Sequence, residues 1–410
     1  MATTSPLSLS LNGRHGRAMG RRPPLPRAVL LLGAVSLLND TASEMVAPLL
    51  PLFLTQTLGA GVAVVGLVEG VAEATASLLK GVSGRVADRT GAHRPLVVGG
   101  YAISNSARPL IGLAPAWGWV LALRFFDRVG KGVRTSPRDG LIAGATVAAQ
   151  RGRAFGFHRA LDHTGAVVGP LIGAALLAAG VAMRSIFLLS IVPGVVAVAV
   201  VWRGVQAAAP PPAAAAVPLR WRALDRRLRG VILAAATLAL ATPSEAFLVL
   251  WARERGVALA VVPLLWAAAH AVKAVVSIPA GTLSDRFGRR VVVAAGWGSR
   301  VLLLVALALA GGGAWVVWSL FLLYAASLAA TEGAERAVVG DLAPAAERAT
   351  AYGLYHLAAG LAALPGGVGF GLLWQGYSPA AAFLAAALLT TAAVVAVVRI
   401  LGGGRAVEEG

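Results

Sequence analysis

Pairs of acidic residues lie inside long apolar stretches of this sequence, at the spacing of one helix face. Asp40 is four residues before Glu44, and Glu69 is four residues before Glu73; residues four apart are neighbours on a helix surface. An ionised carboxylate in apolar surroundings is costly unless it has a partner. Asp40, Glu44 and Glu73 have no adjacent base in the sequence, which favours a role in which they gain and lose protons.

Other ionisable residues stand close to residues of opposite charge. Arg124, Asp127 and Arg128 are spaced for pairing on one helix, and two arginines beside one acid keep it ionised. This pattern is compatible with a structural ion pair and with proton coupling. His158 is four residues before Asp162. The candidates for solute movement and proton coupling are therefore Asp40, Glu44, Glu69, Glu73, Arg124, Asp127, Arg128, His158, Asp162 and Glu245.

The composition places the elements that carry these residues in a membrane. Of 410 residues, 58% are hydrophobic and 13% are charged, whereas ~25% of residues are charged in soluble domains. A helix crosses a bilayer with about 20 apolar residues and satisfies its own backbone groups. The sequence lacks the period-two alternation of a β-barrel. It predicts an all-α integral membrane protein with about twelve transmembrane helices, at 29–55, 61–83, 95–114, 117–136, 154–180, 184–203, 230–252, 259–283, 290–311, 314–340, 350–374 and 379–401.

The charges between the spans indicate how the chain is threaded. The connections around Arg85 and Arg286 are basic, whereas the turns at 58–61, 114–116, 311–314 and 375–379 have no basic residue. Because basic loops stay in the cytoplasm, we expect a multi-pass protein of the bacterial cytoplasmic (inner) membrane with both termini cytoplasmic. Three arginines on predicted outer turns depart from this pattern: Arg184, Arg253 and Arg255.

Composition also divides the chain into segments. A Pro- and Arg-rich stretch interrupts the apolar spans after the sixth, as expected of a linker between two halves. We predict a disordered basic cytoplasmic tail at 1–26, an N-terminal six-helix half at 27–203, a cytoplasmic linker at 204–229, a C-terminal six-helix half at 230–401 and a cytoplasmic tail at 402–410.

Several functional classes are disfavoured. The net charge of +18 is spread between apolar spans rather than gathered in one basic domain, so no nucleic-acid partner is expected. The sequence has no cysteine, no His-Glu-x-x-His, no Gly-x-Ser-x-Gly and no phosphate-binding glycine loop. We therefore predict neither an enzyme nor a cofactor or resident metal.

A motif of glycines around an Asp-Arg pair occurs twice, 197 residues apart, and Ala154-Phe-Gly recurs as Ala351-Tyr-Gly at the same offset. Two matches at one offset predict a duplication, and in transporters built from parallel repeats the solute site lies between the halves. The Ser-Glu pair at Glu44 is echoed at Glu245. The two copies of the motif are Gly84, Asp88, Arg89, Gly91 and Gly281, Asp285, Arg286, Gly288.

The duplicated motif resembles the signature loop of the major facilitator superfamily. The first copy departs from it where Ala92 and His93 replace the usual basic pair, and the second copy is complete. The resemblance implies secondary active transport by alternating access, with these eight residues in gating loops. It also implies that helices 3, 6, 9 and 12 face lipid, so that Arg108 and Arg300 are expected near helix ends, with side chains reaching the membrane surface.

Two further motifs refine the resemblance. In helix 5, Gly165, Gly169, Pro170 and Gly173 resemble a motif associated with antiporters of the superfamily, which implies export; plain helix packing is the alternative. A closer similarity is to bacterial permeases with Asn-Asp-x-x-Ser-Glu in helix 1 and Asp-Arg-x-Gly-Lys-Gly in helix 4, matched here by 39–44 and 127–132. That subset implies no particular substrate.

The sequence thus predicts a monomeric proton-coupled antiporter in the lipid bilayer that exports a small organic or amphipathic solute. One alternative keeps the fold but makes the solute a divalent metal ion, with histidines and carboxylates of two helices as ligands. A membrane-embedded enzyme or a receptor is a more distant alternative. The metal ligands would be His158, Asp162, His163, Glu69 and Glu73.

Overall fold

The computed structural model describes residues 24–147, 150–205, 221, 224–343 and 348–402, and within these ranges the chain forms twelve helical rods and no strand. The first six rods are α1 (Arg27–Glu44) continued by η1 (Ala47–Leu49), α2 (Leu50–Leu52) and η2 (Phe53–Thr57); α3 (Val62–Thr90); α4 (His93–Leu110) with η3 (Ile111–Leu113); α5 (Trp117–Gly144); α6 (Arg151–Ala178); and α7 (Met183–Leu189) with α8 (Ile191–Gly204).

The other six rods are α9 (Arg226–Ala241) with α10 (Glu245–Glu254); η6 (Leu259–Val261) with α11 (Val262–Phe287); α12 (Arg289–Leu309); α13 (Ala314–Leu342); α14 (Arg348–Gly376); and α15 (Pro379–Gly402). The predicted all-α fold of twelve helices is confirmed. By length and composition, ten of these rods are apolar enough to cross a membrane. The two others are α4 and α5, which carry Arg108 and the cluster around Asp127.

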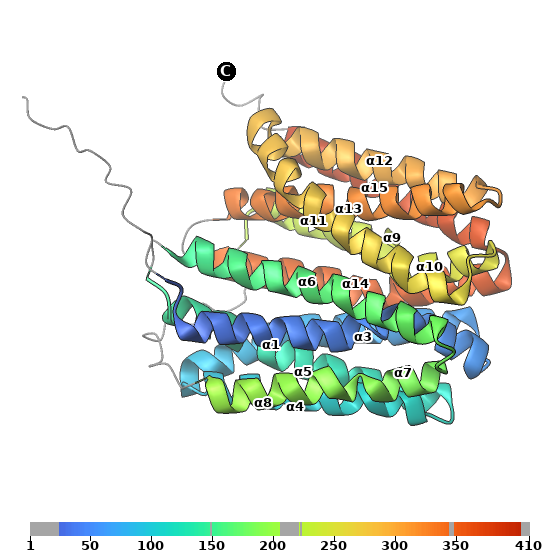
Figure 1. Cartoon of the computed structure of the whole chain (residues 1–410). Helices are drawn as coiled ribbons and strands as arrows, with labels where there is room; N and C mark the ends of the chain where they lie inside the picture. Colours follow the sequence, from blue (N-terminus) through green and yellow to red (C-terminus); the bar gives the residue numbers. More distant parts are fainter. Residues whose placement is uncertain (1–23, 148–149, 206–220, 222–223, 344–347, 403–410) are drawn as a thin grey trace, which may run out of the picture.

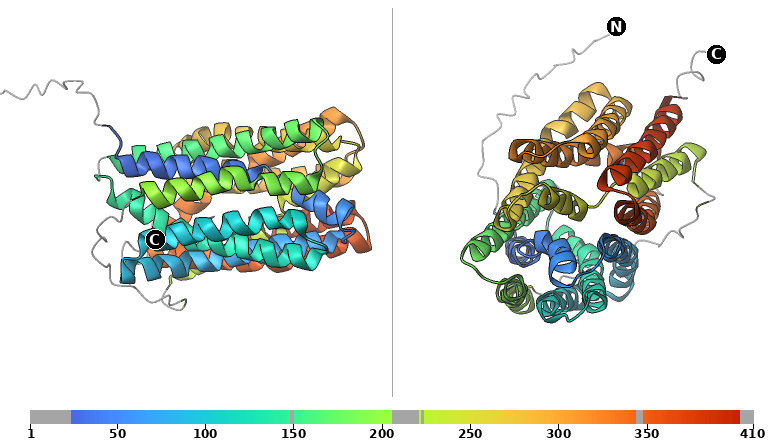
Figure 2. Two further views of the ribbon diagram at one scale, coloured as in Figure 1. Left: turned by 60° about the horizontal axis from the view of Figure 1, so that its bottom comes forward. Right: turned by 90° about the vertical axis from the view of Figure 1, so that its right-hand side faces the viewer.

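The helices repeat at the offset of the sequence motifs. The first residues of α5 and α13, Trp117 and Ala314, are 197 positions apart, and so are those of α6 and α14, Arg151 and Arg348. Helices α1 to α8 form one layer and α9 to α15 the other (Figures 1 and 2). The start of α1 and the end of α15 lie at one end of the bundle, which we call the terminal end, and the ends of η2 and α10 lie at the other, which we call the distal end (Figure 1). Most of the predicted linker, 206–220 and 222–223, lies outside the described residues.

The two layers touch where small residues allow helices to meet backbone to backbone. On α14, a Cβ added to Gly367 would lie 2.8 Å from the carbonyl oxygen of Gly66 on α3, and one added to Gly371 would lie 2.7 Å from the Cα of Ala63. Close packing of this kind drives helix association in lipid. The hydrophobic effect does not, because apolar side chains are as well accommodated by lipid tails as by another helix. The contact between α3 and α14 joins the layers from the distal end to mid-bundle.

The glycines of the helix 5 motif perform the same task inside one layer. Cβ atoms added to Gly165, Gly169 and Gly173 would lie 2.5, 2.6 and 2.8 Å from carbonyl oxygens of α1 and of Met45, which follows it. Pro170 lies within the same helix, α6. The motif therefore seats α6 directly on α1, which is the packing role that the sequence left open.

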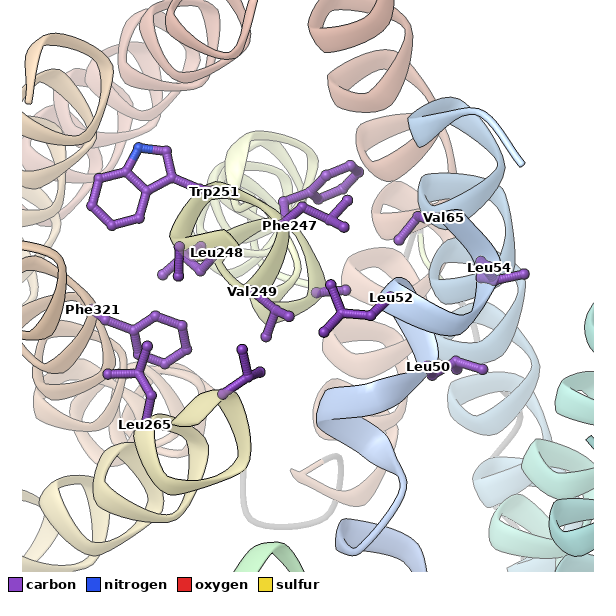
Figure 3. Packing of buried hydrophobic residues seen from close by; sticks show 14 of the residues in the cluster. Leu50, Leu52, Leu54, Val65, Phe247, Leu248, Val249, Trp251, Leu265 and Phe321 are labelled. Atoms are coloured by element: carbon purple, nitrogen blue, oxygen red, sulfur yellow. The ribbon is translucent and has the colours of Figure 1, made fainter. Parts of the chain in front are cut away.

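An apolar plug closes the space between the layers at the distal end. It is one cluster of buried side chains drawn from both layers, including Leu52 of α2 and Phe247 and Val249 of α10. In Figure 3, α10 stands between α2 on one side and α11 and α13 on the other, with Leu265 and Phe321 facing it. Apolar side chains of this size hold water and ions out of the distal end.

The three arginines that depart from the predicted charge pattern donate hydrogen bonds to backbone carbonyls at the distal end. Arg184 donates to the carbonyl oxygens of Gly112 and Ala114 at 3.0 and 2.9 Å. Arg255 donates to the carbonyl of Ala310 at 3.2 Å, and Arg253 to that of Val257. Free carbonyls at helix ends require such donors, so these charges have a local structural cause and carry no information on topology.

The α1–α6 contact gives a stability prediction. Gly165→Ala and Gly169→Ala each place a methyl group against backbone that has no room to move, and each should lower the free energy of unfolding by about 1–3 kcal/mol. Thermal unfolding in detergent, followed by tryptophan fluorescence, measures this. Gly156→Ala is the matched control, because that glycine lies on the same helix with nothing within 4 Å of an added Cβ; it should be neutral or stabilising by up to ~1 kcal/mol. Equal effects at all three positions would contradict the packing role.

Candidate functional site

A cavity of about 370 Å³ lies between the two layers, at mid-bundle. Its polar wall comes from both layers: Glu69, Glu73, Ser77 and Lys80 of α3, Ser244 and Glu245 at the start of α10, and His356 of α14. Gly70 and Gly367 line it beside the α3–α14 contact. A second cavity of about 310 Å³ shares Ser77 and continues along α3 past Val82, Arg85 and Arg89. The second cavity lies nearer the terminal end and the first nearer the centre of the bundle.

Asp127 of α5 is the centre of a buried ion-pair network. Arg108 of α4 lies 3.0 Å from Asp127 Oδ1, while Arg124 and Arg128 of α5 lie 3.3 and 3.5 Å from Oδ2. Arg124 also reaches Glu69 of α3 at 3.1 Å. A carboxylate enclosed by three guanidinium groups stays ionised. The network ties α3, α4 and α5 together, and this geometry favours the structural interpretation of Asp127.

The placement of Arg108 and Arg300 corrects an expectation. Both side chains were expected to reach the membrane surface, but their residues are only 2% and 3% exposed. Arg300 donates to the hydroxyl of Thr331 at 3.0 Å and to the carbonyl of Ser327. A guanidinium that finds acceptors on the next helix needs no aqueous interface.

Three of the predicted acids have no lysine or arginine within 4.0 Å among the described side chains. Asp40 accepts one hydrogen bond, from Asn39 at 3.0 Å. Glu73 accepts one from Ser77 at 3.1 Å. Glu44 accepts one from the indole of Trp266 at 3.0 Å, and His270 lies 3.9 Å away. The sequence favours a role in which these three acids gain and lose protons, and each can change its charge without breaking an ion pair to a lysine or arginine.

The remaining candidate acids are paired. Glu245, at the first turn of α10, lies 2.5 Å from the ammonium group of Lys273 on α11. Asp162 lies 3.6 Å from His158 and 3.7 Å from Arg159, all on α6. Glu69 and Glu73, the other two acids of the proposed metal-ligand set, are on a different helix, α3. In the described part of the chain, no three His, Asp or Glu side chains gather as metal ligands, so the geometry gives the metal alternative no support.

The two copies of the glycine motif lie at the terminal end, and each ends a helix at a glycine with positive φ but a different ψ, 4° at Gly91 and 145° at Gly288. Gly91 ends α3 with φ 69°, and Gly288 ends α11 with φ 88°, conformations that residues with a side chain rarely adopt. Arg89 and Arg286 are exposed. Gly84 lies inside α3 against Ser136 of α5. Gly281 lies inside α11, and the side chains of Asp88 and Asp285 are outside the described ones.

Comparison with known proteins decides the family. The chain matches the Major Facilitator Superfamily model over residues 32–331 and again over 230–409. An uncharacterised transporter of this type from Methanocaldococcus jannaschii is 32% identical over 372 residues, which cover 88% of this chain and 91% of the relative. The chain belongs to the major facilitator superfamily. This is a family of transporters of small solutes, so the prediction of a transporter rather than an enzyme is confirmed.

Other similarities fit this superfamily membership. An uncharacterised protein of Mycobacterium bovis is 33% identical over 371 residues, 86% of this chain and 88% of that protein. The multidrug resistance protein MdtH of Aeromonas hydrophila is 32% identical over 142 residues, 35% of this chain and 36% of that protein. Among solved structures, the nucleoside transporter NupG has a TM-score of 0.77 at 12% identity, covering 91% of this chain and 99% of NupG. The last similarity shows the fold alone.

The Asp127 network gives a second stability prediction. Asp127→Asn removes the carboxylate shared by three buried arginines, of which, among the described side chains, only Arg124 keeps another acid at salt-bridge distance, Glu69, and it should lower the free energy of unfolding by about 3–5 kcal/mol. Asp139→Asn is the matched control on the same helix: Asp139 pairs with Arg138 at 3.1 Å, but its side chain is 45% exposed. That variant should cost no more than ~1 kcal/mol. Unfolding in detergent compares the two, and a smaller loss at Asp127 than at Asp139 would refute the network's structural role.

Proposed function

We propose that this protein is a proton-coupled antiporter that exports a small organic or amphipathic solute through the cavity between its two layers. The single observation that carries the proposal is the cavity itself. It is lined by ionisable groups of both layers, and the apolar plug closes the distal end beside it. A site that touches both halves senses their relative motion, which alternating access requires.

The difference between acids with and without a lysine or arginine at salt-bridge distance supports the coupling mechanism. Glu73 faces the cavity with one hydroxyl as its hydrogen-bond partner. Asp40 and Glu44 lie on α1, which packs against α6, and Glu44 accepts a hydrogen bond from Trp266 of α11. An acid held by a single weak donor can exchange its proton for a hydrogen-bond donor or a cationic group of a solute. Competition between proton and solute for one carboxylate is the simplest basis of exchange.

The charge pattern supports an orientation. The helix ends at the terminal end carry Arg85, Arg89, Arg286 and Arg289, and the arginines at the distal end donate hydrogen bonds to backbone carbonyls. By the positive-inside rule, we assign the terminal end to the cytoplasm of a bacterial cell, so that the described conformation faces inward. The partial similarity to a multidrug resistance protein supports export, whereas the α6 glycines, being packing residues, add no support to it.

Proton release on adding solute to the purified transporter tests the proposal. Ethidium and norfloxacin serve as organic probes, and Zn²⁺ and Mn²⁺ test the metal alternative. A solute of this kind should release protons from the wild type and cross proteoliposomes against a pH gradient. Asp40→Asn, Glu44→Gln or Glu73→Gln should each lower the coupled proton signal at least ~10-fold, the effect of losing an essential proton site.

Glu254→Gln is the control for these variants. Glu254 is also an acid of the bundle, but it accepts a hydrogen bond from Trp374 at the distal end and does not line the central cavity. Its variant should retain proton release. Solute transport without any proton movement, or unchanged coupling in all three variants, would overturn the proton-exchange mechanism while leaving a transporter. Proton release by Zn²⁺ or Mn²⁺ but by neither organic probe would favour the metal alternative.

A further inference from the structure

Glu44 makes a polar contact that joins the two layers at the boundary between the cavity level and the plug. It is the last residue of α1, and its Oε2 accepts a hydrogen bond from Trp266 Nε1 of α11 at 3.0 Å. His270, one turn further along α11, places its Nε2 3.9 Å from the same oxygen. Both side chains of the Glu44–His270 pair are about one-fifth exposed (22% and 20%). The contact is therefore within reach of water.

The charge of Glu44 determines how strongly it attracts Trp266 and His270. His270 Nε2 has no hydrogen-bond partner in the described part of the chain, so Glu44 is the acceptor within its reach. The other charged groups facing Glu44 are Asp40 from its own helix and Arg124 from α5. His163 of α6 and Glu245 of α10 in turn face His270. A proton on His270 would strengthen its pairing with Glu44, whereas a proton on Glu44 would remove the charge that attracts both partners.

The position of this contact relates it to opening. Met45, Val46 and Leu49, which follow Glu44, belong to the distal plug. Opening the distal end requires the end of α1 to leave α11, so the bond between Glu44 and Trp266 has to break first or at the same time. A charge-assisted hydrogen bond in partly apolar surroundings is stronger than a neutral one. Ionised Glu44 thus stabilises the closed distal end more than neutral Glu44 does.

We propose that Glu44, Trp266 and His270 form a lock that keeps the distal end closed whenever Glu44 is ionised and not occupied by solute. A proton on Glu44, or a hydrogen-bond donor of the solute in place of the indole, opens the lock. The inference rests on the proposed exchange function, because an exchanger has to suppress switching when it carries neither partner. The lock supplies that suppression by stabilising one of the two states of the empty carrier.

Distance measurement between spin labels tests the lock directly, since the chain has no cysteine of its own. Thr57→Cys and Ala258→Cys place one label on an exposed residue of each layer at the distal end. In the otherwise unchanged protein at neutral pH, without added solute, pulsed electron paramagnetic resonance should give one short distance. Acidification should add a longer distance, which reports opening.

Variants of the lock should change this distribution in a defined way. Glu44→Gln imitates the protonated acid and should raise the population of the long distance about tenfold at neutral pH, with little further response to acid. Trp266→Phe keeps an aromatic ring in the packing, removes the donor and should also favour the long distance. His270→Asn separates the histidine's titration from that of Glu44, and its acid response should persist.

Trp374→Phe is the matched control. Trp374 donates to Glu254 at 3.1 Å, so it is the same indole–carboxylate pair at the same end of the bundle, but both residues belong to one layer. Its distance distribution should equal that of the parent. The lock is refuted if Glu44→Gln and Trp266→Phe leave the distances unchanged, or if Trp374→Phe opens the distal end equally. Proton-coupled transport that survives such a result retains the proposed function, whereas a working lock without solute-driven proton release would refute that function alone.

Discussion

The cost of a charge inside a membrane is the constraint on which this structure depends. An ionised group there costs at least ~2.5–3.5 kcal/mol on insertion scales unless it is paired or reaches water. Asp127 meets the constraint with three arginines, and in doing so fixes α3, α4 and α5 in one block. Because these charges are satisfied internally, two helices that look too polar to cross a bilayer do so as part of a bundle.

The same constraint separates two kinds of acid. Those with a guanidinium or ammonium group at salt-bridge distance, such as Asp127 and Glu245, are committed to holding helices together. Asp40, Glu44 and Glu73 instead accept one hydrogen bond each from a neutral donor, and a histidine lies beside Glu44. Only the second kind can link protonation to a change of conformation, because a group whose charge is fixed by its neighbours cannot respond to a proton.

The two layers are joined by close helix contacts and by the apolar plug. Small residues on α3 and α14 bring two backbones into contact without interlocked side chains, and such a surface lets helices pivot. At the distal end the two layers meet in an apolar cluster, and the hydrogen bond between Trp266 and Glu44 lies at its edge. An apolar cluster resists opening by its buried area and does not sense protons, so a responsive contact has to sit beside it.

The sequence by itself determined the class of fold, the family and the set of acids worth testing. The lengths of the apolar segments and the 197-residue repeat can be read directly from the sequence. The duplicated Asp-Arg motif identifies the superfamily without knowledge of contacts. An adjacent base did not predict pairing: Glu69 and Glu245 lack one in the sequence as Asp40, Glu44 and Glu73 do, yet both meet a cation from another helix.

Only the tertiary structure decided which side chains pair with each other. Arg108 was expected at the membrane surface, yet it lies against Asp127, 19 residues away on the next helix. Trp266, which no motif marked, is 222 residues from Glu44 and donates to it. The glycines of α6 are packing residues because α1 lies 2.5–2.8 Å from their missing side chains. Helix periodicity fixes which residues share a face, but which face meets which helix depends on packing across the whole bundle, and spacing along the chain does not encode it.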